Sequence, residues 1–254
     1  MLKKSLLAIF AAAVLPLSLN ARIAIDDHEV AGVKPSEKIS VSTLEFNPSI
    51  TVIDDKAGTS ISGMTAKYYQ SFNNMFSLGV ELPFKRFESP NNSANAIGDI
   101  LLSASALKRF DNLAFGTTWE LTVPTATKDV LGIGLWQISP SVFMQYEIVP
   151  QVFLAAGYKH YASFAGPSSR EDINMGRIRG VVAFLSKHNW WILADPQLYI
   201  DYKNNNANEF ILEIETGIML YDEVSIYIKP GWHIAGNRNT MDWSLNFGVK
   251  LLDL

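Results

Sequence analysis

The acids and bases of this chain follow a regular pattern, which makes them the first candidates for chemistry. In about a dozen segments, apolar residues take every second position and charged residues stand between them. Residues 243–251 are an example, because Trp, Leu, Phe, Val and Leu alternate there with Ser, Asn, Gly and Lys. Such alternation places the two sets of side chains on opposite faces of a β-strand. The charges would therefore share one face of a sheet, where they could pair or meet a polar solute.

Sixteen charged residues occupy the polar positions of the predicted strands. They are Glu45, Lys67, Glu81, Lys85, Asp99, Glu120, Glu147, Lys159, Arg177, Arg179, Asp195, Asp201, Glu213, Glu215, Lys229 and Lys250. A mixture of both signs predicts a network of ion pairs more than a selective filter, in which one sign dominates. Glu213 and Glu215, for example, could face Lys229 on the following strand.

Ten of these residues are our candidates for lining a lumen: Lys67, Glu81, Glu120, Glu147, Lys159, Arg179, Asp195, Glu213, Glu215 and Lys229. The alternative is that the charges only satisfy one another inside a closed wall, and the sequence leaves both open.

Catalytic and metal chemistry have weaker signals. His160 stands on the apolar face of its strand, near Ser163 and two loop serines. A general base must lie within about 2.6 to 3.2 Å of its nucleophile and be oriented by a third group. No motif surrounds His160, and Tyr158 beside it favours a histidine at a membrane interface. The chain has four scattered histidines and no cysteine, so we predict no catalytic residue, no metal ligand and no cofactor. A lipid hydrolase using His160 remains an alternative.

Twelve strands must position the charges. They are expected at about 42–53, 61–72, 75–85, 98–107, 113–123, 135–148, 152–162, 177–186, 190–202, 209–220, 224–234 and 242–252. The connections after even-numbered strands are short, and several others are long, notably 86–97, 125–134 and 163–175. Outer-membrane barrels alternate short periplasmic turns with longer external loops, and their strands of about 9 to 11 residues cross the bilayer.

The apolar face is expected to point outward into lipid. A lipid-facing Lys or Arg costs about 2 to 4 kcal/mol at the midplane, and Lys108, at a strand end, is the one charge on the apolar positions. Outward tryptophans near both strand ends are typical of interfacial belts. We therefore predict an all-β fold, a twelve-stranded antiparallel transmembrane barrel of the bacterial outer membrane. A soluble β-sandwich or a large lipocalin-like barrel is the alternative.

The N-terminus predicts export. Lys3 and Lys4 precede an apolar run from Leu6 to Leu17, which is typical of a signal peptide cleaved after Ala21 or Ala24, although an uncleaved anchor is an alternative. We divide the chain into a signal peptide (1–21), a periplasmic lead segment (22–40) and the barrel (41–254). The lead could plug the lumen or act as a tether. A net charge of −4 without a basic stretch excludes nucleic acid as a partner.

Four prolines interrupt the predicted strands on the outward positions: Pro48, Pro140, Pro196 and Pro230. Proline lacks the N–H that a central strand needs and belongs at edges or bulges. We expect bulges here. The alternative is a local break that opens a lateral gap, through which an apolar solute would leave into the membrane.

Two stretches resemble a known family. Gly98-Asp99 opens a strand, and residues 123–141 contain a Pro-Thr, a Gly-x-Gly at Gly132 and Gly134, and Pro140. The middle third of the chain thereby resembles the outer-membrane family named for the meta-pathway of phenol degradation, although Ala126 stands where glycine is expected. The resemblance implies a barrel that transports aromatic compounds, and it carries over no functional residues.

Together these observations predict a channel or transporter for small, hydrophobic or aromatic molecules, and not an enzyme. The expected partners are outer-membrane lipids, a small hydrophobic solute and the outer-membrane assembly machinery. A structural or surface barrel with a closed lumen remains the other alternative.

Overall fold

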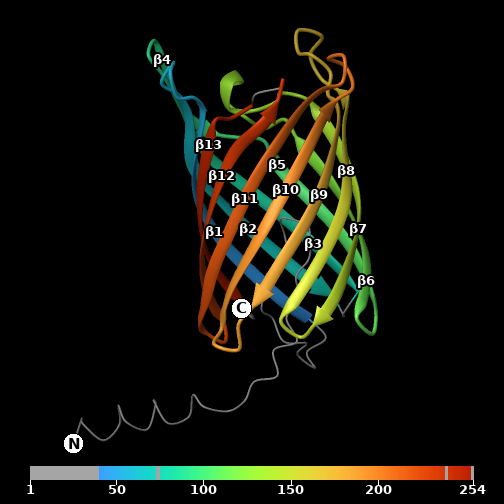
Figure 1. Ribbon diagram of the computed structural model, residues 1–254. Coiled ribbons are helices and arrows are strands. Elements are labelled where there is room, and N and C mark those ends of the chain that lie inside the picture. Colours follow the sequence, from blue (N-terminus) through green and yellow to red (C-terminus); the bar gives the residue numbers. More distant parts are fainter. Residues whose placement is uncertain (1–39, 73–74, 238–239, 253–254) are drawn as a thin grey trace, which may run out of the picture.

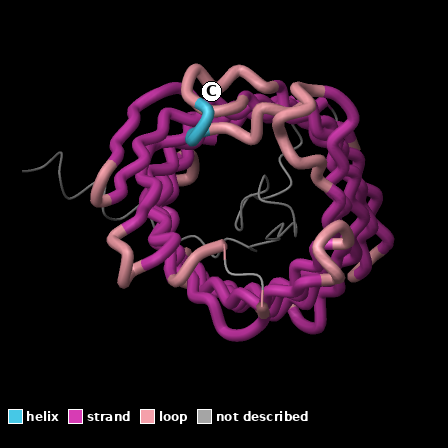
Figure 2. The backbone as a smooth tube through the Cα atoms, turned by 90° about the horizontal axis from the view of Figure 1, so that it is seen from above, coloured by secondary structure: helices cyan, strands magenta, loops and turns pink. Residues whose placement is uncertain are grey.

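The protein forms a closed antiparallel β-barrel. A computed structural model describes residues 40–72, 75–237 and 240–252. Its strands pair in the order β2-β1-β13-β12-β11-β10-β9-β8-β7-β6-β5-β3-β4, and an additional pairing of β2 with β3 closes the ring. The short β4 pairs only with β3, so twelve strands make the barrel wall. Figures 1 and 2 show the tilted strands and the ring that they form. The predicted fold class is therefore confirmed.

The strands are β1 (Ser40–Asp54), β2 (Thr59–Phe72), β3 (Phe76–Ser89), β4 (Asn92–Ile97), β5 (Ile100–Phe110), β6 (Leu113–Val123), β7 (Trp136–Val149), β8 (Val152–Ala165), β9 (Asn174–Leu185), β10 (Trp190–Asp201), β11 (Ala207–Tyr221), β12 (Val224–Gly236) and β13 (Trp243–Leu252). A short 3-10 helix, η1 (Asp129–Leu131), lies between β6 and β7. Among the described residues, no helix is long and apolar enough to cross a membrane.

The two ends of the barrel differ in their connections. At one end the strands are joined at 73–75, 111–112, 150–151, 186–189 and 222–223. Longer connections such as 124–135 and 166–173 lie at the other end. β13 ends at the short-turn end of the barrel, as Figure 1 shows. β1 starts at the same end, because it is antiparallel to both β2 and β13. The predicted alternation of loop lengths is thus present.

The segment 86–97 was predicted as a loop, and that prediction was wrong. β3 continues to Ser89, and β4 pairs with it from Asn92 to Ile97. The hairpin projects beyond the barrel rim in Figure 1, and β4 has a neighbouring strand on one side only, so this segment needs no apolar face. An ion pair between Arg86 and Glu88 lies on its exposed surface. The missing alternation of apolar residues therefore hid a strand pair that has no lipid to face.

The wall has its apolar residues outside and its polar residues inside. On β6, Trp119 is 54% exposed, whereas its neighbour Glu120 is 4% exposed. The same contrast holds on β10, where Ile192 is 42% exposed and Asp195 is 0% exposed. A soluble β-sandwich would bury the apolar face instead. The inside-out arrangement matches the predicted parity of the charges.

The predictions for the N-terminus lie outside the described residues. These are the signal peptide (1–21) and nearly all of the lead segment (22–40). The described chain starts at Ser40, the first residue of β1.

Candidate functional site

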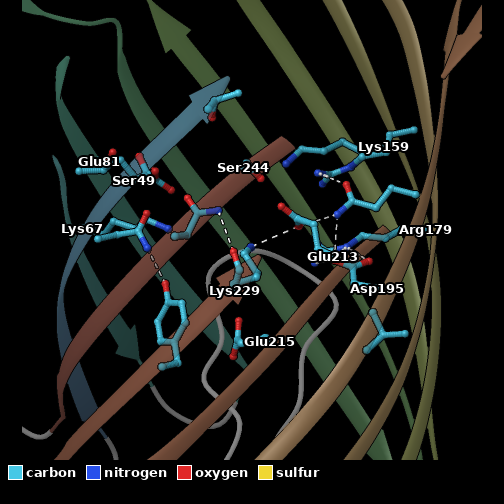
Figure 3. Close-up of a pocket in the computed structure, with 18 of the residues that line it drawn as sticks. Ser49, Lys67, Glu81, Lys159, Arg179, Asp195, Glu213, Glu215, Lys229 and Ser244 are labelled. Carbon is cyan, nitrogen blue, oxygen red and sulfur yellow. Dashed lines mark hydrogen bonds and ion pairs between the residues drawn. The ribbon is translucent and has the colours of Figure 1, made fainter. Parts of the chain in front are cut away.

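The inward side chains of the barrel enclose a cavity of about 490 Å³. Nine of the ten candidate lining residues contribute to its wall: Lys67, Glu81, Glu120, Lys159, Arg179, Asp195, Glu213, Glu215 and Lys229. Figure 3 shows Lys67, Lys159 and Lys229 among those that surround the cavity. The tenth, Glu147, is not among the lining residues, because it lies close to the short-turn end of β7, opposite Phe153.

Strand register brings charges of opposite sign next to one another. Glu45 on β1 lies opposite Lys250 on β13 and Lys67 on β2. Lys67 in turn lies opposite Glu81 on β3. Because each of these residues is on the inward parity, the cross-strand partners meet inside the barrel. The pairing across the closure of the barrel joins residues from opposite ends of the chain.

One set of contacts follows the wall from β6 to β12. Lys159 and Glu120 form an ion pair with both side chains about 5% exposed. Arg179 Nε donates to both carboxylate oxygens of Asp195 at 2.8 and 2.9 Å. Gln197 Nε2 then connects Asp195 to Glu213, donating over 2.9 and 2.8 Å respectively.

The predicted pairing of Glu213 with Lys229 is confirmed. Lys229 Nζ lies 3.4 Å from Glu213 Oε2. Glu215 instead accepts a 2.9 Å hydrogen bond from Trp191 Nε1.

A second set of contacts surrounds Glu45, where β1 and β13 pair to close the barrel. The carboxylate lies 3.5 Å from Lys67 Nζ and 3.6 Å from Lys250 Nζ. Tyr227 Oη donates to it at 2.7 Å and accepts from Asn47 Nδ2 at 2.8 Å. The carboxylate is thus balanced by two ammonium groups. Ion pairs and hydrogen bonds therefore connect the neighbouring strands in this part of the wall.

Both signs of charge face the cavity. Its wall contains six bases (Lys67, Lys159, Arg177, Arg179, Lys229 and Lys250) and five acids (Glu81, Glu120, Asp195, Glu213 and Glu215). The expected network of paired charges is therefore present, and no sign dominates. Our candidate list omitted Arg177 and Lys250, although both stood on the polar parity. It also omitted the lining tyrosines, since parity of charge cannot single out neutral polar rings.

Each of the four outward prolines lies at an interruption of one strand ladder. The affected ladders are β1–β13 at Pro48, β7–β8 at Pro140, β9–β10 at Pro196 and β11–β12 at Pro230. In each case two successive partner pairs are missing, and the register is unchanged on either side. The expected bulges are therefore absent. Proline has no N–H to donate, so a rung is lost without an extra residue being inserted.

The loss is compensated at Pro48 by a neighbouring side chain. The register places Pro48 opposite Phe247. Asn47 Nδ2 donates to the Phe247 carbonyl oxygen at 2.7 Å, so a side-chain amide takes the place of the proline's missing N–H.

Beside Pro140 the wall also contains a small cavity of about 20 Å³. It is lined by inward residues such as Lys159 and by two outward residues, Val142 and Tyr158.

The pieces of the family-like motif meet at the rim of the barrel. Asp99 accepts hydrogen bonds from the backbone N–H groups of Ala126 (3.0 Å) and Ile133 (2.6 Å). A Cβ at Gly132 would lie 2.6 Å from an oxygen of Asp99, and Gly134 has a φ of +68°. Glycine is therefore required where the loop wraps the carboxylate. Ala126 fits this loop despite the departure from the expected glycine.

The residues considered for catalysis are not assembled into a catalytic site. His160 Nδ1 lies 3.1 Å from Tyr158 Oη, and its ring stacks against Tyr202. Ser163 Oγ accepts a 2.8 Å bond from the Ile173 N–H. Within the described part of the chain, no hydrogen bond joins His160 to a serine, and no group of three or more His, Asp or Glu residues could hold a metal ion.

Solved structures with the same architecture include outer-membrane channels and porins. An outer membrane channel from Pseudomonas putida F1 matches with a TM-score of 0.70 and 12% identity, over 91% of this chain and 100% of that channel. The NanC porin has a TM-score of 0.61 and 11% identity, and the KdgM porin 0.60 and 10%; each match covers 82% of this chain and 98% of the porin. No protein-family model and no curated protein matches the sequence. At these identities the similarity shows the fold.

Proposed function

We propose that the protein is an outer-membrane channel for small solutes. The observation that carries the proposal is the closed barrel with an apolar exterior and a polar internal cavity of about 490 Å³. An exposed apolar belt on every side of a barrel needs lipid around it, and the alternation of short turns with longer loops agrees with an outer-membrane orientation. The fold shared with channels and porins supports the same location. Insertion would depend on the outer-membrane assembly machinery.

Charges of both signs in the wall favour solutes that carry polar groups, since a mostly paired lining attracts neither sign strongly. The resemblance to the phenol meta-pathway family suggests aromatic compounds, and membership of that family is part of this proposal. An aromatic solute with a hydroxyl or carboxylate would suit the polar wall better than a hydrocarbon would.

Conductance of single molecules in planar lipid bilayers tests the proposal. We expect discrete current steps from the chain without its signal peptide. A variant that lacks residues 22–39 should be compared with it, because larger currents in the variant would assign a plugging role to the lead segment. The absence of both current and solute flux into protein-containing liposomes, for both proteins, would contradict a channel and favour a structural barrel.

The interrupted ladders support a second route for apolar solutes, sideways through the wall. Pro140 is opposite His160 in the β7–β8 register, and the small cavity beside them is lined by both faces of the wall. A cross-link between Pro140→Cys and His160→Cys would tie the two strands together, and the chain has no other cysteine to interfere. We expect the cross-link to slow uptake of an apolar aromatic such as toluene and to leave ion conductance unchanged. Equal uptake before and after reduction of the disulfide would exclude this route.

A further inference from the structure

One side of the lumen wall, formed by β13, β1 and β2, carries uncharged polar side chains. Six residues of this kind line the cavity, and we call them the neutral patch: Asn47, Ser49, Thr51, Thr65, Ser244 and Asn246. Strand register brings them together, because Thr51 on β1 lies opposite Ser244 on β13. Thr65 on β2 likewise lies opposite Asn47 on β1. Figure 3 shows Ser49 and Ser244 among the side chains around the cavity.

The hydroxyl groups of the neutral patch have unused capacity for hydrogen bonds. In the described part of the chain, the side chains of Ser49, Thr51 and Thr65 make no hydrogen bond to another residue. Ser244 is 5% exposed, and its Oγ is buried without a hydrogen-bond partner. A buried hydroxyl without a partner is unfavourable, so a group that entered the cavity and bonded to Ser244 would be stabilised.

The charged side chains beside the neutral patch are engaged with one another. Glu45 lies 3.5 Å from Lys67 Nζ and 3.6 Å from Lys250 Nζ. Glu213 Oε2 lies 3.4 Å from Lys229 Nζ. A charged solute that bound to these residues would have to compete with pairs inside the protein. A neutral solute on the patch would leave the pairs in place.

The chemistry of the neutral patch fits groups that both donate and accept hydrogen bonds. A serine or threonine hydroxyl can do both. Asn47 Nδ2 donates to Tyr227 Oη at 2.8 Å and to the Phe247 carbonyl oxygen at 2.7 Å, so its Oδ1 is left to accept. A carboxylate only accepts and an ammonium group only donates, so each would use one half of what the patch offers. A solute with several hydroxyl groups can use both halves.

We propose that the neutral patch is a binding site for uncharged polyhydroxylated solutes, such as cyclic polyols and monosaccharides. The solute would lie against β13, β1 and β2, with its hydroxyl groups bonded to the serines and threonines of the patch. The cavity of about 490 Å³ falls within the range of roughly 300 to 1,000 Å³ that is usual for small-molecule sites. This inference rests on the proposed channel function and extends its solutes beyond aromatic compounds.

Equilibrium binding of myo-inositol to the detergent-solubilised protein tests the site without requiring conduction. Saturation-transfer NMR, in a detergent that contains no sugar, gives the dissociation constant by titration. Cyclohexanol has the same carbon ring with a single hydroxyl group. It should bind at least several-fold more weakly than myo-inositol, because fewer hydrogen bonds form. Equal affinity for the two compounds would overturn the site.

A double variant, Ser49→Ala with Thr51→Val, removes two hydroxyl groups and leaves every charge in the wall unchanged. We expect it to weaken myo-inositol binding about fivefold or more, since two hydrogen bonds are lost. Thr122→Val is the matched control, because Thr122 is also a buried threonine of the wall but does not line the cavity. It should change the affinity less than about twofold, because the hydrogen bonds of the site are untouched.

The outcomes separate this site from the channel proposal. No myo-inositol binding by the wild-type protein, or an equal loss in the double variant and the Thr122→Val control, would overturn the site even if the channel conducts. Binding that depends on the two hydroxyl groups, in a protein that passes no solute, would leave the site standing and overturn the channel.

A second pair of variants applies if the double variant fails to fold, judged by migration of unheated protein on gels. Thr65→Val, on β2, should weaken binding about twofold or more, because one hydrogen bond is lost. Thr65→Ser keeps the hydroxyl group and should bind like the wild type. Equal binding by Thr65→Val and Thr65→Ser would count against the site.

Discussion

Asp195 shows how the lumen tolerates an enclosed charge. The residue has no exposed surface, and a carboxylate in such a place is costly unless it is paired and hydrogen-bonded. Arg179 supplies the opposite charge, and Gln197 donates a further hydrogen bond at 2.9 Å. Removing one partner would leave the other charge enclosed without compensation.

We therefore expect Asp195→Asn to lower the free energy of unfolding by about 3 to 5 kcal/mol. The double variant Asp195→Asn with Arg179→Gln should recover much of that loss, because no enclosed charge is left over. Urea unfolding of the protein in lipid vesicles, followed by tryptophan fluorescence, measures both. A double variant as unstable as the single one would show that packing at this place matters more than charge.

Parity in the sequence predicted which charges point inward, but it could not predict all of their partners. Glu120 on β6 and Lys159 on β8 are two strands apart, and they meet across β7. They can do so because the inward residues of β7 between them are the small Ser139 and Ser141. Such a contact depends on side-chain size on the intervening strand as well as on register. The pairing of Glu45 with Lys250 likewise required knowledge of how the barrel closes.

At the scale of elements, the connection between β6 and β7 behaves as a folded cap tied to Asp99. Its backbone donates to that carboxylate from Ala126 and Ile133, while Lys128 remains exposed. The loop is thus held by its interior contacts and presents a trypsin site on its surface.

Asp99→Asn should loosen this loop, because a neutral amide oxygen is a weaker acceptor than a carboxylate and the other half of the amide cannot accept. We expect cleavage after Lys128 at least severalfold faster than in the wild type, detected by limited trypsin digestion and mass spectrometry. Asp172→Asn is the control, since it alters an exposed pair with Lys203 in another loop that is worth about 0 to 1 kcal/mol. Equal digestion of the two variants would mean that Asp99 does not hold the loop.

Pro196 allows the interrupted ladders to be tested one strand pair at a time. It lies opposite Gly180 on β9 in the register that continues on both sides of the gap. Pro196→Ala restores an N–H that could bond to the Gly180 carbonyl oxygen. We expect the free energy of unfolding to rise by about 0.5 to 1.5 kcal/mol.

The hydrogen-exchange rate of the amide at position 196 tests whether the new hydrogen bond forms in that variant. The new amide at position 196 should exchange as slowly as that of its neighbour Gln197. The exchange of the new amide in Pro83→Ala serves as a comparison, because Pro83 faces inward. Exchange at the rate of an exposed loop amide would show that the two strands are separated here by more than a missing donor.

Strand positions were predictable because lipid imposes a strict alternation on every segment that crosses it. The exception was the β3–β4 hairpin, where water on both sides removes that constraint. The missing rungs at prolines could be anticipated from composition. The absence of bulges could not, because it depends on whether the neighbouring strand keeps its register.

At the scale of the whole molecule, the balance of charge in the lumen should govern ion selectivity. Six bases and five acids line the cavity. The zero-current potential under a tenfold salt gradient should therefore lie close to zero. A strong preference of the wild-type channel for one sign would contradict the paired arrangement.

The double variant Glu213→Gln with Glu215→Gln removes two of the five acids, leaving three against six bases. We expect its zero-current potential to shift toward that of an anion-selective channel. The comparison variant Glu147→Gln changes a carboxylate outside the cavity and should shift it much less. Closure into twelve strands was predictable from the sequence, but the size of the cavity was not, since it depends on how far long side chains reach across the lumen.

The β3–β4 hairpin projects beyond the barrel and pairs only within itself at its tip, where Pro90 and Asn91 are exposed. In the proposed orientation this tip stands on the outside of the cell. A short peptide tag placed between these two residues would be displayed to antibodies on intact bacteria without touching the wall or the lumen. In that proposed orientation the hairpin offers an insertion point for surface display. Comparing the antibody staining of whole cells with that of permeabilised cells would report which end of the barrel faces outward.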